Sequence, residues 1–124
     1  MRVKSTREGL IGRRTAIGWD ISKYVPFVAL PSRAALFDYV RVWNPLPAQD
    51  GTIREIIARV LDVGPHHTDD DAYVFGGMRP RAEFDGSNGA GIDLGEFVWQ
   101  ALGMVDNTEV EWEWVIPNGT QKEA

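Results

Sequence analysis

The feature that most constrains the fold is an alternating pattern near the end of the chain. In residues 109–116 (EVEWEWVI), three glutamates alternate with apolar residues. Successive side chains of a β-strand point to opposite faces of a sheet, so this period of two predicts a strand with one buried and one exposed face. The two tryptophans of the segment, Trp112 and Trp114, are then expected in the core of a β protein.

Five earlier segments, rich in β-branched and aromatic residues, are also predicted to be strands. They are residues 15–19, 25–30, 36–43, 52–63 and 72–75. Pro26 and Pro31 predict that the second of these is an edge strand or an irregular strand, because proline cannot donate a ladder hydrogen bond. In residues 36–43 the alternation puts Val40 and Val42 on one face.

One helix is predicted, in residues 91–103 (GIDLGEFVWQALG). Its apolar residues have the spacing of one helical face, and they are Leu94, Phe97, Val98, Ala101 and Leu102. Asp93 and Glu96 have the spacing of a reciprocal N-terminal cap, and Gly103 suits the left-handed residue that ends a helix. We therefore expect a short helix covering an otherwise β protein, with Asp93 at the junction between loop and helix.

Composition limits the class of protein and its partners. A chain of 124 residues with 44% hydrophobic residues is the size of one domain with its own core. The absence of cysteine excludes disulfides and thiolate chemistry. A formal net charge of -5 argues against nucleic acid as a partner, because binding to its backbone needs clustered basic residues. No apolar run reaches the length of a membrane span or a secretory signal, so we expect synthesis in the cytoplasm.

The expected domain organisation is simple. Residues 1–14 hold five Lys and Arg residues and are interpreted as a solvated N-terminal arm, with a docking arm as the alternative. Residues 15–116 form the folded domain, and residues 117–124 form a polar tail. Residues 64–91, rich in Gly and Asp, are expected to be a long functional loop.

Two motifs resemble the double-psi β-barrel of rare lipoprotein A and its relatives. In that family a strand ending in Asp-x-Gly-Pro is followed by an Ile-Asp-Leu-Ser helix start and a helix ending at Leu-Gly. The corresponding motifs here are ARVLDVGP (residues 58–65) and GIDLGEFVWQALG. Looser similarity at TAIG (15–18), ALP (29–31) and YVRV (39–42) extends the resemblance over residues 15–116. It implies a mainly β fold, a six-stranded double-psi β-barrel with one short helix and a long active-site loop.

Expansins, membrane-bound lytic transglycosylase A and family forty-five endoglucanases share this barrel, and most of them act on β-1,4-linked glycans. The resemblance implies that Asp93 is the catalytic acid and that Asp62 supports it. We therefore expect a peptidoglycan lytic transglycosylase or a glycoside hydrolase, acting at the cell wall or periplasm after release by another route, for example in phage lysis. The alternative is a non-catalytic glycan-binding or expansin-like module, or a structural barrel in an assembly. Gly95 in place of the family's serine, and the length of the loop, favour that alternative.

Asp62 and Asp93 can be explained by a catalytic role or by simpler structural roles. A single carboxylic acid can serve a transglycosylase first as acid and then as base. Inverting hydrolysis needs a second carboxylate about 6.5 to 9.5 Å away, and Asp20 is the candidate for it. Alternatively, Asp93 caps a helix whose amides lower its pKa, and Asp62 bonds the amides of the turn at residues 64–65. A nearby Asp62 would instead raise the pKa of Asp93.

The remaining candidate residues are expected around these acids. His66 or His67 is expected to contact substrate or exchange protons, as a histidine after Gly-Pro often does in the family. The pair does not predict a metal site, because adjacent histidines rarely face one ion and a third ligand at a known spacing is lacking. No cofactor is expected. The residues predicted to contact the sugar are Thr15, Trp43, Tyr73, Asn88 and Trp99.

Overall fold

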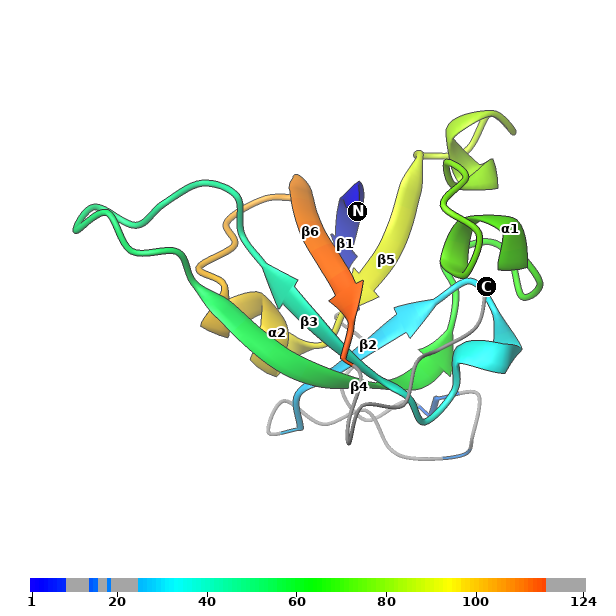
Figure 1. Cartoon of the computed structure of the whole chain (residues 1–124), viewed down its shortest axis with the longest axis horizontal. Coiled ribbons are helices and arrows are strands. Elements are labelled where there is room, and N and C mark those ends of the chain that lie inside the picture. Colours follow the sequence, from blue (N-terminus) through cyan, green and yellow to red (C-terminus); the bar gives the residue numbers. More distant parts are fainter. Residues whose placement is uncertain (9–13, 16–17, 19–24, 116–124) are drawn as a thin grey trace.

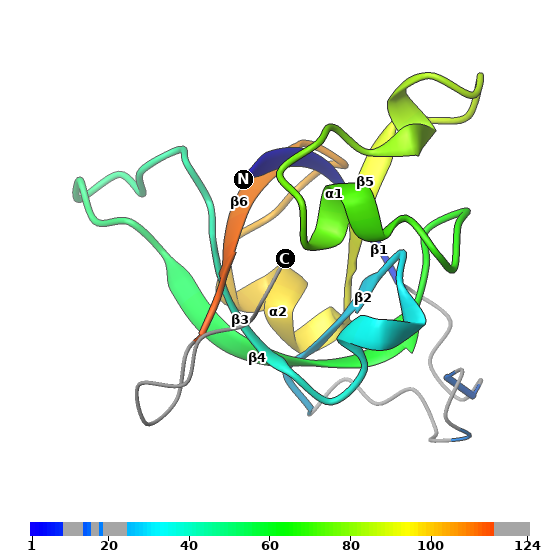
Figure 2. The same ribbon diagram turned by 45° about the vertical axis from the view of Figure 1, so that its right-hand side comes forward.

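A computed structural model describes residues 1–8, 14–15, 18 and 25–115. Six strands in this part form a closed barrel in the order β1-β5-β2-β4-β3-β6 (Figures 1 and 2). The strands are β1 (Arg2–Arg7), β2 (Phe27–Leu30), β3 (Tyr39–Trp43), β4 (Glu55–Val63), β5 (Ala90–Leu94) and β6 (Glu109–Trp114). The helices are α1 (Asp71–Val74), α2 (Glu96–Ala101) and the 3-10 turns η1 (Arg33–Ala35) and η2 (Arg81–Glu83). The predicted mainly β fold with a six-stranded barrel is confirmed.

The two halves of the chain interlock in the barrel. β1 pairs in parallel with β5, and β2 pairs in parallel with β4, whereas the other neighbouring pairs are antiparallel. Exchanging β1, β2 and β3 for β4, β5 and β6 returns the same order and directions, so β5 and β2 meet at the centre of a two-fold arrangement. Because the barrel is closed, every strand has two partners. β2, predicted from its flanking prolines to be an edge or irregular strand, is therefore an inner strand.

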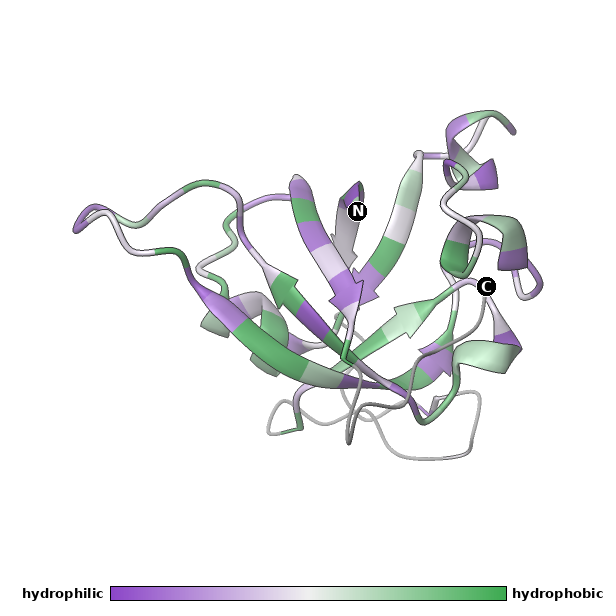
Figure 3. Ribbon diagram, in the orientation of Figure 1, coloured by the Kyte–Doolittle hydropathy of each residue, from purple (hydrophilic) through white to green (hydrophobic). Residues whose placement is uncertain are grey.

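The core is built from alternate residues of the strands. β3, β4 and β6 bury alternate residues along most of their length, as the sequence predicts, and Figure 3 shows bands of hydrophobic and hydrophilic residues along them. Val40 and Val42 are fully buried, and Trp112 is 3% exposed. The Trp112 indole donates to the Tyr73 hydroxyl at 2.9 Å, and this hydroxyl donates to the Gly91 carbonyl at 2.8 Å. The polar atoms of these buried rings are thus satisfied within the barrel.

The first strand departs from the sequence analysis. Arg2–Arg7, interpreted above as part of a solvated arm, is β1 and pairs with both β5 and β6. Val3 and Ser5 are fully buried, while Arg2, Lys4 and Thr6 lie at outer positions. The period of two is present, but only Val3 is apolar, so hydrophobicity does not reveal it. The strand predicted at residues 15–19 lies mostly outside the described residues.

The helix predicted at residues 91–103 is shorter than expected. Its first part is β5, which is held between β1 and β2, and α2 begins only after Gly95. Asp93 is therefore a strand residue and not a helix cap. A Cβ atom on Gly95 would lie 2.6 Å from the ring of Phe27, so a serine would not fit at this position. Gly103 ends the helix with a φ of 65°, as predicted.

The segment expected to be one long loop contains α1 and η2. Residues 72–75, predicted to be a strand, belong mainly to α1. Tyr73 and Val74 are adjacent and both buried in the core, which one turn of helix permits and one face of a strand does not. α1 and η2 lie on one side of the barrel, whereas α2 packs against β2, β4 and β5 (Figure 1).

Candidate functional site

Four residues form a row across the outer wall of the barrel. Thr6 on β1 is in register with Asp93 on β5. Ala29 on β2 is in register with Asp93 on one side and with Asp62 on β4 on the other. The strand neighbours of Asp93 and Ala29 are core residues, so the row faces outward. Adjacent strands lie about 4.8 Å apart, which separates the Cα atoms of Asp62 and Asp93 by roughly 10 Å on the same face.

Asp93 has the electrostatic surroundings of a general acid. The pKa of its carboxyl group is raised from 3.8 to about 6, mainly by burial and also by the charge of Asp62. Two interactions lower the pKa of Asp93. One is a hydrogen bond from the Thr6 hydroxyl to Asp93 Oδ1, and the other is the charge of His66. Because Asp93 lies in a strand, no helix amides lower its pKa, and the cap interpretation is wrong. The carboxyl group therefore retains its proton into mildly acidic conditions.

A third carboxyl group, that of Glu8, joins the row. The Glu8 backbone N–H donates to the Leu94 carbonyl at 2.8 Å, which extends the pairing of β1 with β5. Burial, the proximity of the Asp62 carboxyl group and the charges of Asp62 and Asp93 together raise the pKa of Glu8 from 4.5 to about 9, with burial the largest cause. Sequence analysis misses Glu8 because it falls in the assumed arm. The spacing of Thr6 and Glu8, two residues apart on one strand face, is the signal that identifies it.

Asp62 and the turn that follows it complete the wall. Asp62 Oδ1 accepts the Val63 N–H at 2.9 Å, and not an amide of the turn at residues 64–65 as predicted, because the Gly64 N–H donates to the Leu30 carbonyl at 3.1 Å. A Cβ atom on Gly64 would lie 3.5 Å from Asp93 Oδ2. The turn after β4 therefore runs directly against the Asp93 carboxyl group.

The two histidines have different surroundings. His66 Nε2 lies 2.8 Å from Asn88 Oδ1, which also accepts a backbone N–H at 3.0 Å. Because this oxygen is an acceptor, His66 Nε2 carries the hydrogen, and in the neutral ring Nδ1 keeps its lone pair. His66 also influences the pKa of Asp93, whereas His67 pairs with Asp85 at 2.6 Å. Of the two histidines, His66 is the one near the aspartate row, and Asn88 orients it.

The other predicted contact residues do not all reach this wall. Tyr73 is 1% exposed and Trp99 is 7% exposed, so neither presents a ring for stacking on a sugar, which corrects those two predictions. Trp43 is half-buried on β3, with an arginine guanidinium 4.3 Å from the centre of its ring. Thr15 is buried, and Asp20 lies outside the described residues.

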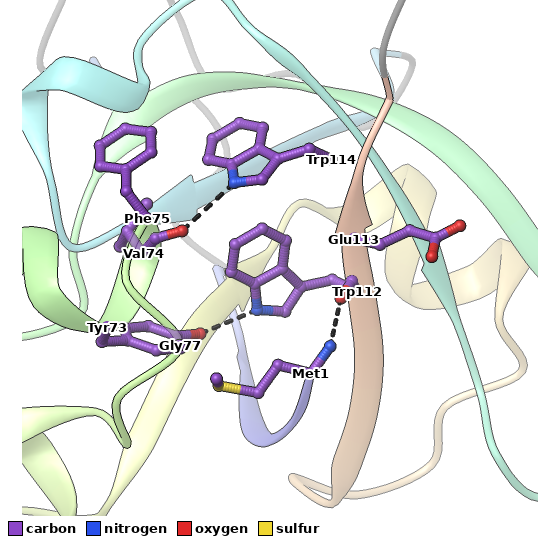
Figure 4. Close-up of a pocket in the computed structure, with 8 residues that line it drawn as sticks. All are labelled: Met1, Tyr73, Val74, Phe75, Gly77, Trp112, Glu113 and Trp114. Atoms are coloured by element: carbon purple, nitrogen blue, oxygen red, sulfur yellow. Dashed lines mark hydrogen bonds between the residues drawn. The ribbon is translucent and has the colours of Figure 1, made fainter. Parts of the chain in front are cut away.

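An aromatic pocket of about 230 Å³ lies between α1 and β6 (Figure 4). It is lined by Met1, Tyr73, Val74, Phe75, Gly77, Trp112, Glu113 and Trp114. The rings of Phe75 and Trp114 are stacked, with their centres 5.3 Å apart. The Trp114 indole N–H donates to the Val74 carbonyl at 3.2 Å. The indole N–H groups of Trp112 and Trp114 therefore both donate to other groups of the protein. The lining of the pocket does not include Glu8, Asp62 or Asp93.

Two kinds of feature bear on metal binding and membrane crossing in the part of the chain that the structure describes: groups of metal-binding side chains and membrane-spanning helices. There, no group of three His, Cys, Asp or Glu side chains is placed to hold a metal ion. No helix of these residues has both the length and the apolar character needed to cross a membrane.

Fold and site together define a closed β-barrel protein with a cluster of carboxyl groups on its outer wall. The chain belongs to the family described as Domain of unknown function (DUF8814), whose model matches residues 1–86. The matched part contains Thr6, Glu8 and Asp62 and ends before β5, which carries Asp93. No curated protein matches the chain.

Proposed function

We propose that this protein cleaves a β-1,4-linked glycan, with peptidoglycan as the substrate and Asp93 as the general acid. The supporting observation is the register of Asp93 and Asp62 across Ala29. It puts a carboxyl group that holds its proton on the same wall as a second acid. Glycosidic cleavage needs a proton for the leaving oxygen and negative charge near the anomeric carbon, which becomes positive in the transition state.

In the proposed transglycosylation, Asp93 acts twice. Its proton passes to the glycosidic oxygen as the bond from that oxygen to the anomeric carbon breaks. The Asp93 carboxylate then takes the proton of a hydroxyl group on the same sugar, whose oxygen bonds to the anomeric carbon. No water is consumed, and Asp93 ends protonated as it began. The charge of Asp62 favours the positive anomeric centre between these two steps.

The proposed place of action is the cell wall or periplasm, reached by release or as part of a phage. The test uses purified peptidoglycan sacculi, incubated with the whole chain and followed by mass analysis of the soluble products. Anhydro-sugar ends support transglycosylation, whereas reducing ends support hydrolysis. Intact sacculi contradict both reactions.

Two variants separate the acid from its surroundings in this assay. Asp93→Asn removes the proton donor and should abolish product release. Asp106→Asn is the matched control, because Asp106 is exposed and its Oδ1 bond to the Asn107 N–H at 2.7 Å is one that asparagine can also make. Full activity of Asp93→Asn would remove the catalytic assignment.

A second candidate function, glycan binding without cleavage, is supported by the outer face of β3. Tyr39 is 44% exposed there, and the preceding Phe37 is 47% exposed with a φ of 74°. The guanidinium of Arg59 lies 5.3 Å from the Tyr39 ring and 5.4 Å from the Phe37 ring. Exposed rings held in this way can stack on sugars. Sacculi that retain the protein but release no fragments would favour this candidate.

A further inference from the structure

The carboxyl groups of Glu8 and Asp62 lie within hydrogen-bonding reach of each other. A carboxylate oxygen can only accept a hydrogen bond, so a bond between two carboxyl groups requires that one of them be protonated. The pair therefore holds one proton and one negative charge. Neither member was expected from the sequence to form such a pair.

The surroundings of the two groups decide which one holds the proton. Glu8 Oε2 is buried and receives no hydrogen bond from a donor among the described residues. A buried carboxylate oxygen without a donor is unfavourable, whereas a protonated carboxyl group costs much less to bury. Asp62 Oδ1 instead accepts the Val63 N–H, a bond that favours the ionised form. The proton consequently belongs to Glu8 and the charge to Asp62.

The nearest basic residue in the sequence does not neutralise this pair. Arg7, next to Glu8 in the chain, directs its side chain to Glu96 on α2 through two hydrogen bonds of 2.6 Å. Among the described residues, the charged groups that raise the pKa of Glu8 are Asp62 from β4 and Asp93 from β5. If Glu8 were ionised as well, three negative charges would meet on one wall.

We propose that Glu8 is a positioning residue of the carboxyl site, which carries the proton shared with Asp62 and keeps Asp62 as the single anion facing Asp93. Its effect on catalysis rests on the proposed function, but its protonation does not. Glu8 acts through Asp62 and needs no contact with substrate. A neutral Glu8 limits the negative charge near Asp93, so that Asp93 can still release and recover its proton.

Carboxyl-carbon NMR of the ¹³C-labelled whole chain tests the location of the proton. During a titration from acidic to alkaline pH, the Glu8 carbon should keep the shift of a protonated carboxyl group through neutrality. A Glu8 carbon that titrates with the pKa of an ordinary glutamate, about 4.3, would overturn the inference.

Two substitutions of Glu8 test the positioning role. Glu8→Gln keeps a neutral group that can donate to Asp62, so the Asp93 titration midpoint and the neutral-pH rate of product release should stay unchanged. Glu8→Ala removes the donor, and both should change, with the rate falling about ten-fold or more. Equal loss in both variants would contradict a neutral, proton-holding Glu8. Glu113→Gln, an exposed change on β6, is the control.

The two readouts distinguish this inference from the proposed function. A Glu8 that keeps its proton in a protein that leaves sacculi intact would support the inference and contradict the cleavage reaction. Cleavage by a protein whose Glu8 titrates as an ordinary glutamate would contradict the inference alone.

Discussion

Replacing Asp93 with asparagine should stabilise the protein at neutral pH while removing the proposed acid. The folded protein holds the Asp93 proton more tightly than the unfolded chain, because burial raises the pKa from 3.8 to about 6. The stability contributed by this protonation is fully present below about pH 3.8 and is lost as the pH rises through about 6. Asparagine does not titrate, and its side-chain oxygen can still accept the Thr6 hydroxyl.

The size of the effect follows from the two pKa values. The difference between 3.8 and about 6 corresponds to about 3 kcal/mol at pH values above both. Asp93→Asn should therefore raise the free energy of unfolding by up to about 3 kcal/mol near pH 8 relative to its effect near pH 4. In thermal unfolding, this gain corresponds to an increase in Tm of roughly 10 °C.

Urea unfolding at several pH values measures this difference. The wild-type protein should lose stability between about pH 4 and pH 7 more steeply than the variant does. Asp106→Asn should leave the pH dependence unchanged, because that side chain is exposed. A variant less stable than the wild type at every pH, with an unaltered slope, would refute the reasoning and make Asp93 a structural acceptor.

Three further variants test other parts of the structure. Arg7→Ala should lower the free energy of unfolding, because Glu96, only 5% exposed, loses a salt bridge with an Arg7 nitrogen at 2.6 Å. Gly95→Ser should lower it by about 2 kcal/mol, since the new Cβ atom would lie 2.6 Å from the Phe27 ring. Urea unfolding measures both. Tyr39→Ala should reduce co-sedimentation with sacculi about five-fold, because an exposed stacking surface is lost.

Each of these variants has a control or a contrary outcome. Arg2→Ala breaks an exposed ion pair with Glu111, separated by 3.7 Å, and should lower the free energy of unfolding by less than about 1 kcal/mol. An equal loss in Arg2→Ala and Arg7→Ala would contradict a larger contribution from the pair of Arg7 with Glu96. Unchanged stability of Gly95→Ser would show that the Phe27 ring can move aside. Phe97→Ala removes another exposed ring, 40% exposed on α2, and an equal loss of binding would argue against the face of β3.

The three strands β3, β4 and β6 could be predicted from the chain because their signal is local. Each carries apolar side chains at alternate positions, and this period needs no knowledge of the partner strands. In β4 the alternation identified a strand even though several of its residue types also suit a helix. The convergence of Asp62 and Asp93 was expected only through the family resemblance, because the two lie on different strands far apart in the sequence.

Only the tertiary structure decided the roles of the segments whose local signals were ambiguous. Polar Arg2–Arg7 becomes a strand because β5 and β6 both offer backbone partners, and Glu8 reaches Asp62 because the barrel closes around β2 and β5. Asp93 has the sequence context of a helix cap, yet the strands on either side of it hold it extended. Residue type and periodicity are properties of a short segment, whereas burial, pairing and shared protons depend on residues that only the closed barrel brings together.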